Sequence, residues 1–223
     1  MVTSTSINSR LGVGLYSVDE AARIIGTTPG TIGRWIRSKF FKPRFCSQEQ
    51  TLTFAELMEL NFIKMFRNEG VSLRVIQAAS REMAARFGAE YPLTFKQFDT
   101  DGRSIFLTLK NTSGDLVMEE VHHGQLVFDT IVKPFFRKLE YDNNDKLLRF
   151  WPLASKSSKG RVVLDPCRKF GKPIDAESGV RISTIMDALT AGKGQKPKVV
   201  ADWLGVPLSA VKAAESFSKS LSA

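Results

Sequence analysis

The apolar positions between residues 17 and 44 recur with the spacing of helices. The residues that would share one face of a first helix are Val18, Ala21, Ala22 and Ile25. Ser17 and Glu20 stand three positions apart, as in a capping box, where each side chain satisfies a backbone N–H of the other residue. Gly26 favours the end of this helix.

A second short helix is predicted after a tight turn. Thr28 can cap it, and Pro29 suits its first position because no N–H bond is lost there. Ala22 is small where the two helices would touch, Gly26 would lie in the turn, and Ile32 would enter the core from the second helix. Together these features predict a helix-turn-helix.

Polar and basic residues occupy the other side of the second helix and continue after it. The candidate DNA-binding residues are Thr28, Thr31, Arg34, Arg37, Ser38, Lys39, Lys42 and Arg44. A major groove admits such a helix, with base edges and phosphates within reach. The alternative is a helical hairpin whose basic face is only solvated. The agreement of spacing, caps and charge favours DNA binding.

Two longer helices are predicted next. Thr53 and Glu56 form a second capping box, which opens a helix over residues 53–69. That helix is apolar on more than one side, so it must bury two faces. Ser72 begins another helix, which ends at Gly88.

The middle of the chain has a different pattern. Residues 91–121 contain short apolar runs separated by turn-forming residues at 99–102 and 111–114, which predicts strands joined by turns. Residues 128–139 return to helical spacing, with Pro134 expected to kink or restart the helix. Residues 139–152 predict a hairpin.

The C-terminal part is predicted to be helical again, over residues 183–189, 196–204 and 208–217. The offsets that join Ala22, Gly26 and Ile32 recur in Ala201, Gly205 and Val211, which indicates a second helix-turn-helix. Its outward residues are Ser209, Ala210, Lys212, Ala213 and Glu215. This set is nearly neutral, so it suits a protein contact better than a DNA contact.

These elements predict an α+β chain of three domains. They are a helical helix-turn-helix DNA-binding domain (1–90), a strand-rich middle and dimerisation region (91–152), and a small helical domain with the second helix-turn-helix (153–223). The chain carries 32 Lys and Arg against 23 Asp and Glu, a net charge of +9, which favours polyanionic partners such as nucleic acid. Residues 153–223 alone carry +6.

Several functional classes find no support in the sequence. Cys46 and Cys167 are far apart, with no Cys or His at ligand spacing, so we expect neither a disulfide framework nor a metal site. No nucleophile or carboxylate pair stands out, so we expect no enzyme and no cofactor. The chain shows no signal peptide and no apolar run near eighteen residues, so we expect a cytoplasmic protein.

Residues 17–40 resemble the opening of MerR-type regulators, in which a helix-turn-helix leads into an Arg–aromatic pair. Arg34 and Trp35 match this pair. The resemblance implies that both residues engage the DNA backbone, which adds Trp35 to the candidate DNA-binding residues. The wing is short and no long dimer helix with effector cysteines follows, unlike in metal- or drug-sensing members.

The segment from residue 162 to residue 183 resembles a small bacterial domain, first described as a domain of unknown function and later associated with VapB-type antitoxins. The matching residues are Asp165, Pro166, Gly171, Pro173, Gly179, Arg181 and Ile182, and Val180 stands where a Thr is usual. A longer subgroup of these antitoxins carries a MerR-like helix-turn-helix in front. The resemblance implies a repressor that also neutralises a PIN-domain ribonuclease toxin.

The first hypothesis is therefore a homodimeric DNA-binding antitoxin of a toxin–antitoxin system. Its partners would be double-stranded operator DNA and a PIN-domain toxin, whose acidic groove suits a cationic surface. The candidate toxin-binding residues are Arg161, Arg168, Lys169 and Arg181. The alternative is a MerR-like transcriptional regulator whose middle domain binds a small molecule.

Overall fold

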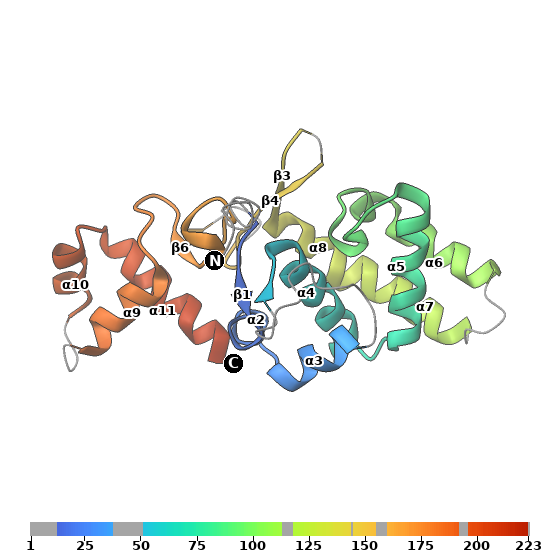
Figure 1. The fold of residues 1–223 in the computed structure, drawn as a ribbon, viewed down its shortest axis with the longest axis horizontal. Coiled ribbons are helices and arrows are strands. Elements are labelled where there is room, and N and C mark those ends of the chain that lie inside the picture. The colour runs from blue at the N-terminus through green and yellow to red at the C-terminus, as the bar shows by residue number, and fades with distance from the viewer. Residues whose placement is uncertain are drawn as a thin grey trace, which may run out of the picture. The chain divides into compact units, whose positions relative to one another are not determined.

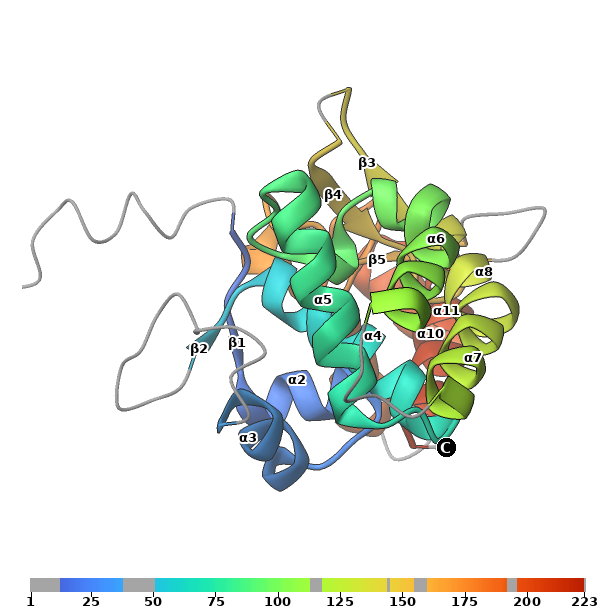
Figure 2. The same cartoon turned by 90° about the vertical axis from the view of Figure 1, so that its right-hand side faces the viewer.

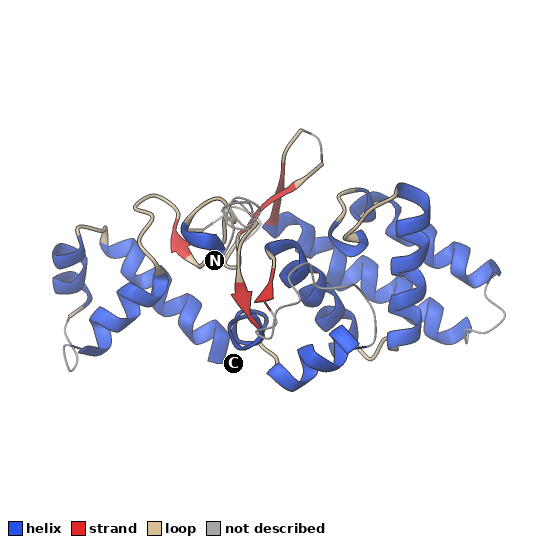
Figure 3. Cartoon of the chain, viewed as in Figure 1, coloured by secondary structure: helices blue, strands red, loops and turns tan. Residues whose placement is uncertain are grey.

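A computed structural model describes residues 13–37, 51–112, 118–143, 145–154, 160–191 and 196–222. They form two compact units. The helix-turn-helix unit comprises the described parts of Ser17–Arg137 and Tyr141–Leu147, and the C-terminal unit those of Met1–Tyr16, Lys138–Glu140 and Leu148–Ala223. Helices dominate and the strands are short, which confirms the α+β class (Figure 3).

The helix-turn-helix unit is almost wholly helical (Figure 1). Its elements are α2 (Val18–Ile25), α3 (Pro29–Arg37), β2 (Thr51–Leu52), α4 (Phe54–Asn68), α5 (Leu73–Phe87), η1 (Pro92–Thr94), α6 (Gln97–Thr112), α7 (Met118–Val127), η2 (Phe128–Val132) and α8 (Lys133–Phe135). Both capping boxes are present. Glu56 accepts a hydrogen bond of 2.7 Å from the backbone N–H of Thr53 and donates its own N–H to the Thr53 hydroxyl at 3.3 Å.

Aromatic rings fill the centre of this unit. The buried ones include Phe62, Phe66, Phe98, Phe106, Phe128 and Phe136. The ring centroids of Phe62 and Phe136 lie 5.0 Å apart, as do those of Phe98 and Phe128. Helix α4 therefore buries more than one face, as its pattern predicts: it packs on α2, on α5 and on η2.

The prediction of strands over residues 91–121 is wrong. Residues 97–112 form α6, and α7 lies beside it (Figures 1 and 2). The buried side of α6 consists of Phe98, Gly102, Ile105, Phe106 and Leu109, which recur at helical and not at strand spacing.

The predicted turn at residues 99–102 lies inside α6. A Cβ atom at Gly102 would overlap the ring of Phe128, so this glycine permits a close contact between α6 and η2. A glycine that serves packing has the same sequence signature as one that serves a turn.

Pro134 distorts the helix that contains it, as predicted. The turn before it, η2, is a π-helix, and α8 follows with the proline near its start. Proline has no N–H to donate, and its ring crowds the carbonyl group four residues earlier. A wider turn avoids that clash without ending the helix.

Each of four short elements contains residues of both units. These elements are β1 (Tyr16–Ser17), η3 (Phe136–Lys138), β3 (Leu139–Tyr141) and β4 (Leu147–Phe150). Strands β3 and β4 pair with each other, which confirms the predicted hairpin. The backbone N–H of Asp142 donates to the carbonyl of Lys146 at 2.9 Å near its tip.

The C-terminal unit combines a small irregular region with three helices. Its elements are β5 (Val162–Val163), η4 (Lys169–Gly171), β6 (Ile174–Asp175), α9 (Ile182–Ala191), α10 (Pro197–Leu204) and α11 (Leu208–Ser222). Strands β5 and β6 pair antiparallel, Val162 opposite Asp175 and Val163 opposite Ile174. The three helices enclose an apolar core that includes Ile185 and Val200.

Ion pairs and one buried tyrosine hold the irregular region together. The Tyr16 hydroxyl donates a hydrogen bond of 2.6 Å to the carbonyl of Gly171. The Arg149 guanidinium contacts the carboxylates of Asp165 at 2.8 Å and Glu140 at 3.1 Å.

In the part of the chain that is described, no helix is both long enough and apolar enough to cross a membrane.

Candidate nucleic-acid interface

The first helix of the interface, α2, is fixed at both ends. Ser17 and Glu20 form the predicted capping box, with N–H to side-chain distances of 3.0 and 3.2 Å. At the other end Gly26 has φ of 67°, a left-handed conformation that glycine adopts without strain. The N–H of Thr27 then donates to the carbonyl of Ala22 at 2.8 Å, which closes the turn.

Helix α3 begins as the sequence predicts. The Thr28 hydroxyl accepts a hydrogen bond of 3.2 Å from the backbone N–H of Thr31, and Pro29 is the first helical residue. Ala22 and Ile32 are buried where α2 packs on α3. The helix-turn-helix is confirmed.

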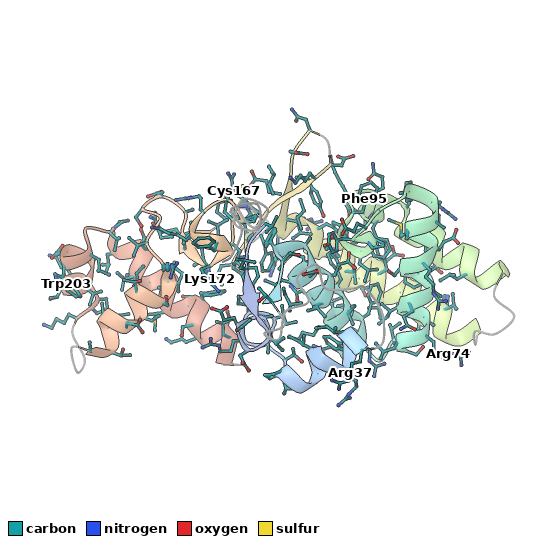
Figure 4. The ribbon with its side chains drawn as sticks, viewed as in Figure 1. Arg37, Arg74, Phe95, Cys167, Lys172 and Trp203 are labelled. Carbon is teal, nitrogen blue, oxygen red and sulfur yellow. The ribbon has the colours of Figure 1, made fainter. Side chains whose placement is uncertain are left out.

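The exposed side of α3 carries a stripe of three residues: Gly30, Arg34 and Arg37, spaced at i, i+4 and i+7. Arg37 projects outward from the end of the helix (Figure 4). No acidic residue occurs in α3, so the positive charge of both arginines is not neutralised within the helix. We name these residues the α3 stripe.

Other predicted DNA-binding residues have different positions. Thr28 is exposed beside the stripe and Thr31 is half-buried. Trp35 is only 6% exposed, so its ring packs in the core and Arg34 alone of the Arg–aromatic pair faces outward. Ser38, Lys39, Lys42 and Arg44 lie outside the described residues.

Lys64 supports this interface and was not predicted from the sequence. Its ammonium group, on α4, donates a hydrogen bond of 2.5 Å to the carbonyl of Ile25 at the end of α2. A cation at the C-terminus of a helix satisfies a free carbonyl and complements the helix dipole. Burial lowers the pKa of Lys64. The contact joins residues 39 positions apart, so no local pattern signals it.

The second helix-turn-helix is also confirmed, and its turn repeats the first one. Gly205 has φ of 64°, and the N–H of Val206 donates to the carbonyl of Ala201 at 3.0 Å. Val211 is fully buried, as Ile32 is in the first motif.

The second motif exposes large apolar side chains as well as charged ones. Val199 and Trp203 on α10 are 49% and 72% exposed, and Leu208 at the start of α11 is 37% exposed. Trp203 stands out from α10 in Figure 4. We name these three residues the α10 patch. The sequence contains a signal for it, because Val199 and Trp203 are four positions apart and Val200 and Ala201 turn to the core.

The four predicted toxin-binding cations separate into two groups. Arg161 is engaged within the chain, because its guanidinium binds the buried carboxylate of Asp175 and that of Glu177. Arg168, Lys169 and Arg181 surround one hollow of the C-terminal unit. Among the described residues, no cluster of three or more His, Cys, Asp and Glu side chains could hold a metal ion.

Comparisons with known proteins agree with this geometry. The sequence model of the MerR HTH family regulatory proteins matches residues 16–82. The chain is also similar to a Mycobacterium tuberculosis protein named "Putative antitoxin VapB45", with 25% identity over 92% of this chain and 94% of the relative. The helix-turn-helix unit therefore contains a MerR-type helix-turn-helix domain, as the sequence predicts.

A solved structure has the same fold. The crystal structure of Rv2018 from Mycobacterium tuberculosis superposes with a TM-score of 0.75 at 22% identity, over 92% of this chain and 98% of that one. The likeness extends over both units, so the fold continues beyond the MerR-type domain.

Proposed function

We propose that the protein is a homodimeric antitoxin that represses its own operon through α3 and neutralises a PIN-domain ribonuclease toxin through its C-terminal unit. The observation that supports DNA binding most directly is the α3 stripe, which is basic, exposed and part of a MerR-type helix-turn-helix. The name of the mycobacterial relative supports the antitoxin role. In this proposal the chain acts by binding alone, in the cytoplasm.

The α3 stripe suits a major groove in charge and in shape. Arg34 and Arg37 can reach phosphates or the acceptor atoms of guanine. Gly30 has no side chain, so the backbone of α3 is uncovered at this position, which lies between the turn and the two arginines. A Cβ atom at Gly30 would meet nothing within 4 Å. The helix can therefore approach DNA closely at this point. One short helix makes few contacts, so two copies that read two half-sites are expected.

The α10 patch supports a protein partner for the C-terminal unit. Exposed tryptophan is uncommon on a monomer surface, and tryptophan is enriched among the residues that dominate binding energy in interfaces. The second helix of this motif, α11, carries only Lys212 and Glu215 in its first two turns, against Arg34 and Arg37 on α3, so a phosphate backbone would gain less from α11. A toxin surface with an apolar pocket is the partner that we infer for Trp203.

Co-expression tests the toxin role. The gene product encoded next to this one is produced with and without the full chain, and growth and complex formation are followed. We expect the neighbouring protein to arrest growth alone, and the full chain to restore growth and co-purify with it. Unrelieved arrest together with the absence of a complex would refute the antitoxin role and leave DNA binding untouched.

A further inference from the structure

The hollow in the C-terminal unit has a basic rim. It measures about 680 Å³ and is lined by Arg168, Lys169, Ser178, Gly179, Val180, Arg181 and Thr184. These residues come from the segment before and within η4, from the turn after β6, and from the first turn of α9. No lining residue is acidic.

The cations around the hollow differ from the other arginines of the same unit. Arg149 and Arg161 each bind two carboxylates within the chain. Among the described residues, the side chains of Lys169 and Arg181 contact no acid, and Arg168 binds only the carbonyl of Ala176, through Nη1 at 2.9 Å. Four acids of this region, Glu140, Asp165, Asp175 and Glu177, are thus paired with Arg149 and Arg161, whereas the described rim cations form no ion pair with an acid.

One rim cation, Arg168, is oriented by the fold before any ligand binds. The hydrogen bond to Ala176 orients the Arg168 guanidinium, whose Nη2 would lie 3.0 Å from a Cβ atom at position 179. Gly179 therefore leaves room for that group. A fixed donor loses less conformational entropy when it binds an anion.

The hollow offers hydrogen-bond donors, so it suits a ligand that carries acceptor atoms. The Ser178 hydroxyl is engaged, because it donates to Asp175 and accepts from the N–H of Val180. The other lining residues with side-chain donors are the three cations and Thr184. In α9 the N–H of Ile182 donates to Pro173 and that of Ile185 to Arg181. The N–H groups between them lie in the first turn, where a helix offers no acceptor.

We infer that this hollow binds a small molecule through a phosphate group, a phosphomonoester of about nucleotide size. Guanidinium, ammonium, hydroxyl and helix N–H groups are the donors that phosphate sites combine. The volume lies within the range of small-molecule sites, and the concave shape favours a free ligand over a DNA backbone. The site belongs to the C-terminal unit alone, so it is independent of the α3 stripe.

Calorimetric titration of the full chain tests this inference. The probes are adenosine 5′-monophosphate, inorganic phosphate, and adenosine as the control without a phosphate. We expect the monophosphate to bind and adenosine to give no heat. Lys169→Gln and Arg181→Gln alter exposed side chains, so both variants should fold, and each should weaken binding roughly ten- to a hundredfold. Lys198→Gln removes the same charge from α10 and should bind like the unaltered chain.

Three outcomes would overturn the inference. One is the absence of monophosphate binding in the millimolar range, and another is equal binding by all the variants. The third is inorganic phosphate or adenosine binding as tightly as the monophosphate, which would exclude a site for a whole phosphomonoester.

Discussion

Arg161 and Asp175 form a two-bonded ion pair inside the C-terminal unit. The guanidinium donates to the two carboxylate oxygens at 2.8 and 3.0 Å, and the Asp175 side chain is 1% exposed. Burial raises the pKa of Asp175, but hydrogen bonds from Arg161 and Ser178 outweigh it and hold the pKa below its ordinary value. A cation expected to face a partner thus stabilises the fold around β5 and β6.

Replacing Arg161 should destabilise the protein strongly. Arg161→Ala leaves a buried carboxylate without its partner, which costs about 3–5 kcal/mol. Urea unfolding of the full chain measures the loss. Arg181→Ala, which removes an exposed arginine from the same unit, should change the free energy of unfolding by less than about 0.5 kcal/mol. Similar losses for the two variants would show that the pair contributes little.

Stability should fall as the pH rises because of Glu59. This carboxyl group is buried in α4 and accepts a hydrogen bond of 2.9 Å from the N–H of Thr94. Burial raises its pKa from 4.5 to about 8, although the hydrogen bonds oppose the shift. The folded state therefore holds the proton more tightly than the unfolded state. The resulting stabilisation is complete below pH 4.5 and is lost as the pH rises toward 8.

Glu59→Gln removes this titration and keeps the shape of the side chain. The unaltered protein should lose about 1.4 kcal/mol per pH unit across that window from Glu59, and the variant should lack this component. Glu90→Gln, an exposed substitution, should retain it. Denaturant unfolding at a series of pH values distinguishes them, and parallel profiles for all three proteins would count against a protonated Glu59.

The sequence predicts best what neighbouring residues decide. The capping boxes at Ser17 and Thr53 and the turns at Gly26 and Gly205 depend on groups within a few positions, and all four are found. The prediction of strands over residues 97–112 is wrong for a different reason. Their β-branched and aromatic runs favour strands locally, but packing against α5 and η2 decides the helix.

The candidate site shows the same division. The turn and the outward arginines of α3 follow from the helical period. The engagement of Arg161 by Asp175 and the support of Ile25 by Lys64 join distant residues, so the sequence alone could not separate a structural cation from a binding one. Trp35 adjoins the apolar Ile36, so the sequence allows either a core position or a DNA contact for Trp35, and the structure places it in the core.

Gly30 provides a test of close DNA approach. A methyl group at this position meets no protein atom within 4 Å, so Gly30→Ala should stabilise the free protein by about 0.5–1 kcal/mol through helix propensity. The same methyl group would keep the α3 backbone away from DNA, so affinity for a DNA fragment from upstream of the protein's own gene should fall. A variant that is both more stable and equally tight in binding would exclude a close approach at Gly30.

If the chain neutralises a toxin as proposed, Trp203 should dominate the contact with that toxin. Trp203→Ala removes an exposed side chain, so folding should be unaffected, while affinity for the toxin should fall by roughly 2 kcal/mol or more. Leu126→Ala is the control, because Leu126 is also exposed, at 54%, on α7 of the other unit. Surface plasmon resonance with immobilised toxin gives both affinities. Equal affinities of the Trp203→Ala and Leu126→Ala variants would show that the toxin does not bind at the α10 patch.

The role of α3 is tested most directly by the salt dependence of promoter binding. Fluorescence anisotropy gives the affinity of the full chain for a DNA fragment from upstream of its own gene at several salt concentrations. We predict that Arg34→Ala and Arg37→Ala weaken binding. Each lost phosphate contact should reduce the slope of log K against log salt by about 0.9 per DNA-bound subunit. Arg103→Ala, on α6, should leave both quantities unchanged. Unaltered affinity and slope in both α3 variants would contradict DNA binding through this helix.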